Sequence, residues 1–189
     1  AADVVRGLHR LGAKVHLLSG DRLEAVRAAA AAIGADAWTA AASPADKTRL
    51  VEQLRARGQR VALVGDGIND APALAAADLS IAMGGGTEVA VGQADVTLLG
   101  SDLRAILALL DLGKHTRRIL VQNLGWAFGY NLLGIPLAAG VLYPWTGDMP
   151  SPVLASAAMA LSSVSVVGNS LRLQRWKPPS QTQFGSKPS

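Results

Sequence analysis

Charged side chains are missing from two long stretches of this chain, although they are frequent in its first part. Residues 126–143 and residues 151–171 contain no aspartate, glutamate, lysine or arginine. Each stretch is close to the roughly 20 residues that a helix needs to cross the hydrocarbon core of a membrane. We therefore predict two transmembrane helices, at about 126–144 and 151–171. Two buried helices of a globular protein are the alternative, which the length of the uncharged runs disfavours.

The chain also lacks cysteine, and only 4% of its residues are aromatic. Its basic and aromatic residues are not interleaved, so nothing argues for nucleic acid as a partner. Neither uncharged stretch has a carboxylate, a lysine or a histidine, which disfavours a site for a hard or divalent ion. The net charge of +4 follows from the bases beside these stretches and from scattered surface arginines.

Basic residues stand on the outer side of both predicted spans, whereas the connection between the spans carries only Asp148. The flanking bases are Lys114, Arg117 and Arg118 before the first span, and Arg172, Arg175 and Lys177 after the second. Positively charged flanks stay in the cytoplasm, so the connection is predicted to lie outside. The predicted location is the plasma (inner) membrane, with lipid as a partner, two passes in this chain and the preceding residues in the cytoplasm.

The sequence Val61-Ala-Leu-Val-Gly-Asp-Gly-Ile-Asn-Asp-Ala-Pro72 is the most informative motif. Its first four residues have the composition of a fully buried strand, and Gly65 and Gly67 bracket Asp66 where the backbone must turn tightly. Magnesium is usually held by one or two carboxylates together with phosphate oxygens and water. Asp66 and Asp70 are therefore predicted Mg²⁺ ligands. The alternative is a strand-turn-helix corner in which the aspartates only cap the helix.

Two earlier segments carry candidate phosphate ligands. Residues 14–21 form a predicted strand that ends in Ser19-Gly20-Asp21, just before a predicted helix over 22–33, whose N-terminus favours an anion. Ser19 is a candidate phosphate donor, or else a plain N-cap. Lys47 lies in the first turn of a second predicted helix, from Ser43 to about Arg57. The helix dipole disfavours a cation there, so Lys47 is either placed for a ligand or a solvated surface lysine.

Further strands are predicted over 78–83 and 95–99, with a short helix from Thr87 between them. Alternating strands and helices of this length predict an α/β fold with a parallel, doubly wound sheet. Ser101 and Asp102 offer an N-cap for a helix that continues past Lys114 toward the first predicted span. The chain starts within a helix, indicated by apolar residues at helical spacing, namely Val4, Val5, Leu8 and Leu11.

The order of hydroxyl-Gly-Asp, Pro-x-x-Lys and Gly-Asp-Gly-x-Asn-Asp-x-Pro resembles the haloacid dehalogenase-like phosphorylation domain of P-type ATPases. The resemblance implies that Ser19, Gly20, Asp21 and Lys47 are catalytic and stabilise an aspartyl-phosphate. It also implies that Asp66 and Asp70 hold Mg²⁺, with support from Gly65, Gly67 and Asn69. Ser19 replaces the threonine that is more usual in this family, but it keeps the hydroxyl group.

The family's nucleophile is the aspartate of a DKTGT motif, and this chain contains no DKTGT. The nucleotide-binding domain, the actuator domain and the earlier membrane helices of the family are also absent. We therefore expect a C-terminal fragment, whose partner is the missing N-terminal part of the same pump. A covalent phosphoenzyme requires the nucleophile, so these residues alone are not expected to turn over ATP, which the missing part mainly binds.

The two uncharged stretches resemble the last membrane helices of copper-exporting P1B-type ATPases of the CopA kind. The resemblance implies Cu(I) transport sites at Tyr130, Asn131, Met159 and Ser163, together with a CPC motif on an earlier helix. A thioether is a soft ligand that suits Cu(I). Without the resemblance, Met159 could equally be a packing residue, and the serines could serve helix-helix contacts. A copper chaperone is a further partner that the resemblance implies.

The predicted organisation is a partial haloacid dehalogenase-like domain over 1–113, two transmembrane helices within 114–173 and a disordered cytoplasmic tail over 174–189. The predicted function is ATP-driven export of Cu(I) by a P-type heavy-metal ATPase. Two alternatives stay open at this point. One is a P1B pump for another metal, Ag(I), Zn(II) or Cd(II); the other is a non-catalytic truncated membrane protein.

Overall fold

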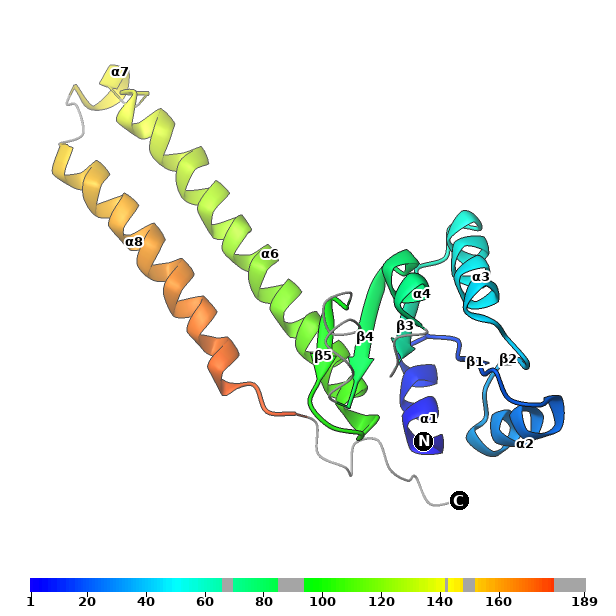
Figure 1. Cartoon of the computed structure of the whole chain (residues 1–189). Helices are drawn as coiled ribbons and strands as arrows, with labels where there is room; N and C mark the ends of the chain where they lie inside the picture. Colours follow the sequence, from blue (N-terminus) through cyan, green and yellow to red (C-terminus); the bar gives the residue numbers. More distant parts are fainter. Residues whose placement is uncertain (66–69, 85–93, 142, 148–151, 179–189) are drawn as a thin grey trace. The chain divides into compact units, whose positions relative to one another are not determined.

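The computed structural model describes residues 1–65, 70–84, 94–141, 143–147 and 152–178 (Figure 1). The chain divides into two compact units, of which the first comprises Ala1–Leu107 and the second begins at Ala108. The first unit is an α/β structure with short parallel strands, and the second is a helical hairpin.

The strands of the first unit form two parallel sheets. β1 (His16–Leu18) pairs with β2 (Ala37–Thr39), and β3 (Ala62–Gly65) pairs with β4 (Leu79–Met83), which also pairs with β5 (Val96–Leu98). All of these pairs are parallel, as the alternation of strands and helices predicts. The strand β2 was not predicted, and the described strands form a two-stranded and a three-stranded sheet rather than one continuous sheet.

One helix precedes the strands, and three connect them. The first is α1 (Ala2–Arg10), and the connecting helices are α2 (Leu23–Ile33), α3 (Pro44–Ala56) and α4 (Ala71–Ala76). The side chain of Ser43 accepts from the Asp46 amide, and the Asp46 carboxylate accepts from the Ser43 amide, which fixes the start of α3. Gly34 ends α2 in the left-handed conformation, at φ 75°, where glycine is favoured.

The core of the first unit is built from small and branched apolar side chains. α1 buries Val4 and Val5, as its helical spacing predicts. A Cβ on Gly7 would lie 2.6 Å from Leu107 Cδ1, so only glycine allows the two to pack this closely. Other fully buried side chains come from helices and strands that follow one another along the chain: Val26, Val51, Leu74 and Ile81.

In each parallel strand pair, an aspartate just before the second strand accepts a hydrogen bond from the backbone at the start of the first strand. The three hydrogen bonds run from the amides of Val15, Val61 and Ser80 to Asp36, Asp78 and Asp95, respectively, at 2.7–2.9 Å. Each bond stabilises the ionised carboxylate and lowers the pKa of that aspartate below its ordinary value. The three carboxylates therefore join neighbouring strands where each pair begins.

The strand β3 is less buried than its composition predicts. Ala62 is exposed and Val64 keeps 38% of its surface accessible, although the run Val61–Val64 was predicted to be fully buried. The cause is the topology: β3 pairs with β4 on one edge, and within the described residues its other edge has no strand partner. An open apolar edge of this kind is a site where a further strand can pair.

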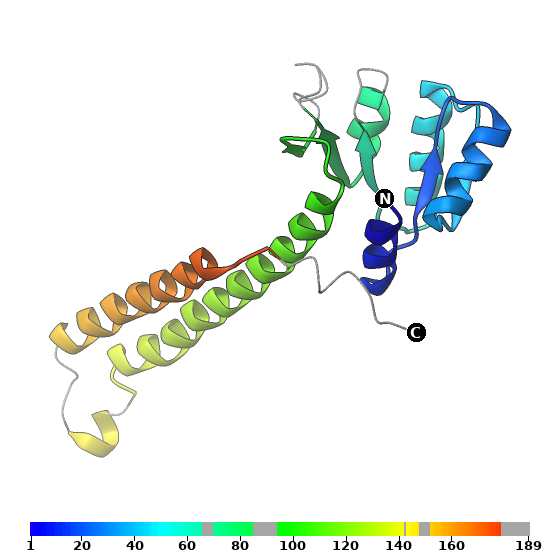
Figure 2. The ribbon, with the colours of Figure 1, turned by 90° about the horizontal axis from the view of Figure 1, so that it is seen from below.

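The second unit is dominated by two long helices, α6 (Arg104–Ala138) and α8 (Pro152–Leu171), followed by the short 3₁₀-helix η2 (Arg172–Arg175). The Asp102 carboxylate accepts from the Arg104 amide at 2.9 Å and caps α6, as predicted. The helix continues without interruption past Lys114, which confirms the predicted continuous helix. The two helices run side by side in opposite directions (Figures 1 and 2).

The helix α6 ends at Ala138, shortly after Pro136, and α7 (Tyr143–Thr146) follows a turn in which Gly140 has φ 80°. The helix α6 therefore covers the first predicted span, 126–144, only as far as Ala138. Among the described helices, none combines the length and the hydropathy needed to cross a membrane. The two predicted transmembrane spans are thus not confirmed.

The segment after α8 corrects the predicted start of the tail. Gln174 lies within η2, and the indole Nε1 of Trp176 donates to Asp111 Oδ2 at 2.9 Å. The first residues of the predicted disordered tail are therefore held against α6 by an aromatic anchor. Composition alone missed this contact because it depends on a single tryptophan in an otherwise polar segment.

Candidate functional site

Two residues predicted to serve the phosphate site are in direct contact. Lys47 Nζ in α3 lies 2.6 Å from Asp70 Oδ1, at the start of α4, and their side chains are only 18% and 14% exposed. This geometry excludes both simple alternatives. Lys47 is not a solvated surface lysine, and the Asp70 side chain makes no capping hydrogen bond to α4.

Gly65 makes room for this ion pair. A Cβ at this position would lie 2.9 Å from Asp70 Oδ2 and 3.1 Å from the Cβ of Asp70. Gly65 is buried and ends β3, so the missing side chain lets the start of α4 approach the end of the strand. The predicted support role of this glycine therefore has a steric cause. Asp66, Gly67 and Asn69, which were predicted beside it, lie outside the described residues.

Ser19 follows β1 and forms a compact turn with Asp21. Its hydroxyl donates to Asp21 Oδ2 at 2.9 Å and accepts from the Asp21 amide at 3.2 Å. The helix α2 has Arg22 as its N-cap and no side-chain cap, so Ser19 is not the plain N-cap that was the alternative. Gly20 has ordinary clearance, because a Cβ there would meet only the Ala42 carbonyl at 3.7 Å.

The loop between β2 and α3 connects the Ser19 turn to Lys47. The Ala42 amide donates to the Ser19 carbonyl at 3.0 Å, and the Ala41 amide donates to the Asp21 carbonyl at 2.9 Å. Ala41 adopts a positive φ of 49°, which is uncommon for a residue other than glycine. This loop was missed in the sequence. Its backbone holds the turn that carries Ser19 beside the start of the helix that carries Lys47.

The arrangement can hold an anion next to a metal ion. The Lys47 ammonium is a point charge suited to phosphate, and the Ser19 hydroxyl is a hydrogen-bond donor. The Asp70 carboxylate offers the hard oxygen that Mg²⁺ prefers. In this state the two charges of the Lys47–Asp70 pair satisfy each other.

The predicted transport residues in the helical hairpin are not gathered at one point. Tyr130 faces α8, where its hydroxyl lies 3.4 Å from Ser165 Oγ. Met159 is 72% exposed, Asn131 is exposed, and the hydroxyl of exposed Ser163 donates to the Met159 carbonyl at 3.4 Å. The described hairpin alone therefore forms no closed site from these four side chains.

A polar cluster between the hairpin helices was not predicted. Asn169 Nδ2 donates to Asn123 Oδ1 at 2.8 Å and, at 3.3 Å, to Gln122 Oε1. Asn123 Nδ2 in turn donates to Ser170 Oγ at 2.8 Å. The pairing of amide side chains across two helices fixes their register. The amides themselves are visible in the sequence, but their pairing depends on how the helices pack.

Comparisons with known proteins agree with the fold. A family model of haloacid dehalogenase-like hydrolases matches residues 1–78, and a second model with the same description matches residues 47–110. A solved structure of apo phosphoserine phosphatase, 24% identical, covers 57% of this chain and 64% of its own with a TM-score of 0.51. At this low identity, the likeness shows only the fold of the first unit and no function.

Relatives with higher identity extend over nearly the whole chain. Over 93% of its length the chain is 52% identical to "Probable copper-transporting ATPase PacS" of Synechococcus elongatus. It is 50% identical over 92% of its length to "Copper-exporting P-type ATPase" of Legionella pneumophila. The chain spans 23% and 24% of these two relatives, about a quarter of their length.

The structure of a zinc-transporting PIB-type ATPase in its E2.Pi state superposes with a TM-score of 0.79 at 35% identity, covering 91% of this chain and 27% of its own. A catalytic domain of the CPx-ATPase CopB-B superposes with a TM-score of 0.54 at 37% identity. The match covers 57% of this chain and 42% of that domain. The resemblance indicated by the motifs is confirmed: over nearly its whole length, this chain is similar to about a quarter of the length of P-type ATPases that are named copper-transporting or copper-exporting.

Proposed function

We propose that this chain is part of a pump that couples ATP hydrolysis, through an aspartyl-phosphate, to export of Cu(I) from the cytoplasm. The observation that carries the proposal is the Lys47–Asp70 pair beside Gly65, in which residues of two separate motifs meet. The names of relatives support the cargo, since three that match at 49–52% identity are named as copper-transporting or copper-exporting ATPases.

In the proposed site, Lys47 and Ser19 bind the phosphoryl oxygens. Lys47 neutralises charge that develops on the transferred group, and Ser19 orients one oxygen through its hydroxyl. The Gly20 amide and Asp21 belong to the same turn. Asp70, together with Asp66, would hold Mg²⁺, which supplies positive charge next to the phosphate when it is bound. The Asp70 carboxylate fits this role because its oxygens are hard ligands, its side chain is only 14% exposed, and it already pairs with the Lys47 ammonium group.

The nucleophile must come from a segment outside this chain, because no DKTGT motif is present. Among the residues that the structure describes, one edge of β3 has no strand partner and Val64 is exposed, which supports this proposal. A further parallel strand on that edge would bury Val64 and bring its own carboxyl end to the end of β3. Such a strand is the proposed contribution of the missing N-terminal part of the pump, which would also bind ATP.

For the helical hairpin we propose a place in the membrane, as part of a multi-pass protein of the plasma (inner) membrane. Many large apolar side chains of its two long helices are exposed, and extensive apolar surface is normally covered by lipid or by other helices. The side chains of Met159 and Asn131 are both exposed. A Cu(I) site that includes them, Tyr130 and Ser163 would therefore be completed by ligands from further helices.

The alternatives differ in cargo and in class. The zinc-transporting structure is 35% identical to this chain, whereas copper-named relatives reach 52%, and neither predicted span has a carboxylate for Zn(II) or Cd(II). Ag(I) shares the soft chemistry of Cu(I) and stays an alternative cargo. A non-catalytic truncated product stays the alternative of another class. A copper chaperone as partner stays an expectation from the resemblance.

Phosphorylation of the complete pump tests the proposed function. Asp70→Asn removes the proposed metal ligand but keeps the shape of the side chain, and Lys47→Ala removes the charge that faces phosphate. We expect each variant to lower Mg²⁺-dependent phosphoenzyme formation from ATP by about 100-fold or more, which corresponds to about 3 kcal/mol. Normal phosphorylation of both variants would remove the pair from the site and with it the proposed function.

A further inference from the structure

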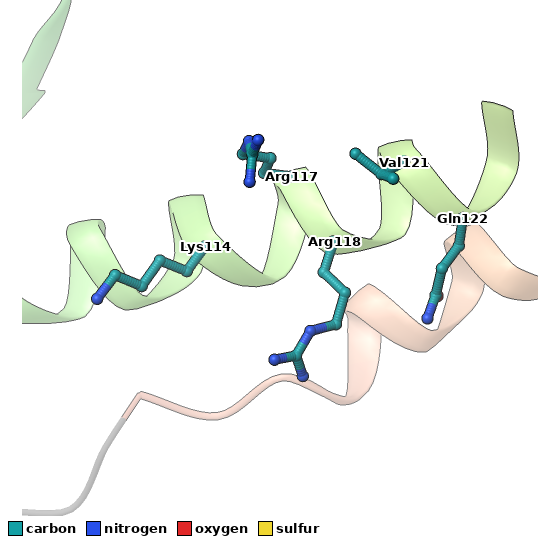
Figure 3. Close-up of a pocket in the computed structure, with 5 residues that line it drawn as sticks. All are labelled: Lys114, Arg117, Arg118, Val121 and Gln122. Carbon is teal, nitrogen blue, oxygen red and sulfur yellow. The ribbon is translucent and has the colours of Figure 1, made fainter. Parts of the chain in front are cut away.

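A basic cavity on α6 is not used by the phosphate site or by the proposed copper site. It has a volume of about 430 Å³ and is lined by Lys114, Arg117, Arg118, Val121 and Gln122 (Figure 3). All five residues belong to the second unit. The spacing explains the shared surface: Lys114, Arg118 and Gln122 are four residues apart, so they form one row along the helix, with Arg117 and Val121 in the adjacent row.

The three cations of this cavity have no counter-charge of their own. In the part of the chain that the structure describes, neither a carboxylate nor another hydrogen-bond partner contacts Lys114, Arg117 or Arg118. The nearest acid on the same helix, Asp111, is already engaged, because it accepts from Trp176 Nε1 and lies 3.3 Å from His115 Nδ1. The cavity therefore presents unneutralised positive charge to an anion.

Further basic groups are held in the same region of the hairpin. The bond from Trp176 to Asp111 fixes the segment after α8 against α6, one helical turn before Lys114. Arg175 and Lys177 flank the anchored tryptophan on either side. Figure 3 shows Arg118 extending toward the ribbon of this segment. The tryptophan anchor thus adds positive charge from a second element to the charge on α6.

Apolar side chains follow the cations directly along α6. Leu120, Val121 and Leu124 are each more than half exposed, at 57–61%. A ligand with an anionic head and an apolar body matches this arrangement, because its head can contact the cations and its body the apolar side chains. Free phosphate can contact only the cations. Arginine can bind two phosphate oxygens at once through its planar guanidinium group, and two of the lining residues are arginines.

We propose that this cavity binds the phosphate headgroup of an anionic phospholipid, whose acyl chains lie along Leu120, Val121 and Leu124. The proposal rests on the membrane placement proposed for the hairpin, but not on the phosphorylation chemistry. Gln122 also lines the cavity; its Oε1 accepts from Asn169 Nδ2 at 3.3 Å, and its amide N–H groups are further donors that an anion can use. Juxtamembrane basic clusters attract anionic lipid in this way.

The test uses the full 189-residue chain in a non-ionic detergent. Native mass spectrometry measures how much phosphatidylglycerol or phosphatidylcholine is retained, and inorganic phosphate is titrated separately. The test variant is Lys114→Gln/Arg117→Gln/Arg118→Gln. The matched control, Lys14→Gln/Arg27→Gln/Arg57→Gln, removes the same charges from exposed positions of the first unit. Helix content by circular dichroism shows whether each variant is folded.

We expect the unmodified chain to retain phosphatidylglycerol at least about tenfold more strongly than phosphatidylcholine, and the test variant to lose that preference. The control variant should keep it. The conservative variant Arg117→Lys/Arg118→Lys should keep most of the binding, because the charge remains, even if the triple variant does not fold.

Three outcomes overturn the proposal. They are equal retention of both lipids by the unmodified chain, equal loss in the test and control variants, and inorganic phosphate binding as strong as that of phosphatidylglycerol. The last outcome would indicate a free-anion site instead. Failure here leaves the proposed function standing, since that function is tested by phosphorylation of Asp70 and Lys47 variants of the complete pump.

Discussion

Gly65→Ala tests whether the close approach of β3 to Asp70 is needed by the site. The added methyl group would lie 2.9 Å from Asp70 Oδ2, 3.1 Å from its Cβ and 3.4 Å from its Cγ. The carboxylate oxygen can rotate away, but the Cβ can move only if the start of α4 moves with it. Asp70 is also held by Lys47 at 2.6 Å, so any rotation stretches the ion pair.

The magnitude follows from these contacts. Overpacking by one methyl group in a fixed environment costs about 1–3 kcal/mol, and the loss of glycine flexibility in the unfolded chain returns about 0.4–1 kcal/mol. We expect a net loss of about 1–2 kcal/mol in the local free energy of unfolding around β3 and α4. A shift of a few tenths of an ångström at Asp70 should also slow phosphorylation by roughly tenfold, given about 100-fold for a 1 Å misplacement.

Hydrogen exchange of peptides from β3 and α4 measures the first effect, and phosphoenzyme formation in the complete pump measures the second. Gly20→Ala is the matched control within the same site, because its Cβ would meet only the Ala42 carbonyl, at 3.7 Å. In an Asp70→Ala background the penalty of Gly65→Ala should shrink, since the oxygen and Cγ contacts are gone. Equal behaviour of Gly65→Ala and Gly20→Ala in both assays would refute the steric argument.

Two further predictions concern the strands and the cargo. Folding lowers the pKa of the Asp36, Asp78 and Asp95 carboxyl groups. These carboxylates therefore stabilise the first unit at pH values above their unfolded pKa of about 3.9. This contribution to the free energy of unfolding is lost as the pH falls through the lower pKa values of the folded state. Asp78→Asn should flatten the decline of the urea midpoint below about pH 4, and an unchanged slope would contradict this. Met159→Ala should weaken Cu(I) binding and Cu(I)-stimulated ATPase activity of the complete pump, while metal-free phosphorylation from inorganic phosphate is preserved. Val153→Ala, a truncation at a similarly exposed site of α8, is its control, and equal effects of the two would return Met159 to a packing role.

The elements that sequence reasoning found are those with long or strongly marked patterns. The period of α1, the helix predicted from Ser43, and the apolar runs before Gly65 and from Leu79 all correspond to elements that are present. The strand β2 was missed because Ala37–Thr39 lacks the apolar run that marks the segments of β1 and β5, so that pairing with β1 rather than its own composition makes it a strand. β-propensity depends on neighbours in this way.

In the candidate site, too, single residues could be predicted from the sequence, whereas their contacts could not. Residue types and spacing singled out Lys47 and Asp70 separately, each with a mundane alternative. Their contact is a tertiary fact, because α3 and α4 are brought together by packing and 22 residues separate the two side chains along the chain. The supporting loop at Ala41 has no sequence signature at all, since alanine gives no signal of a positive φ.

The Lys47–Asp70 pair has a consequence for how the proposed ligands bind. In the described state each charge neutralises the other at low exposure. Mg²⁺ binding to Asp70 alone would leave the Lys47 ammonium nearly buried beside a second cation, and phosphate binding to Lys47 alone would leave the Asp70 carboxylate beside a second anion. Either half-filled state is costly, because an uncompensated charge in a nearly buried position is strongly destabilising. When both ligands bind, Lys47 pairs with phosphate, Asp70 pairs with the metal, and charge balance is restored. The proposed site should therefore bind Mg²⁺ and phosphate with positive coupling, each raising the affinity for the other by the same factor.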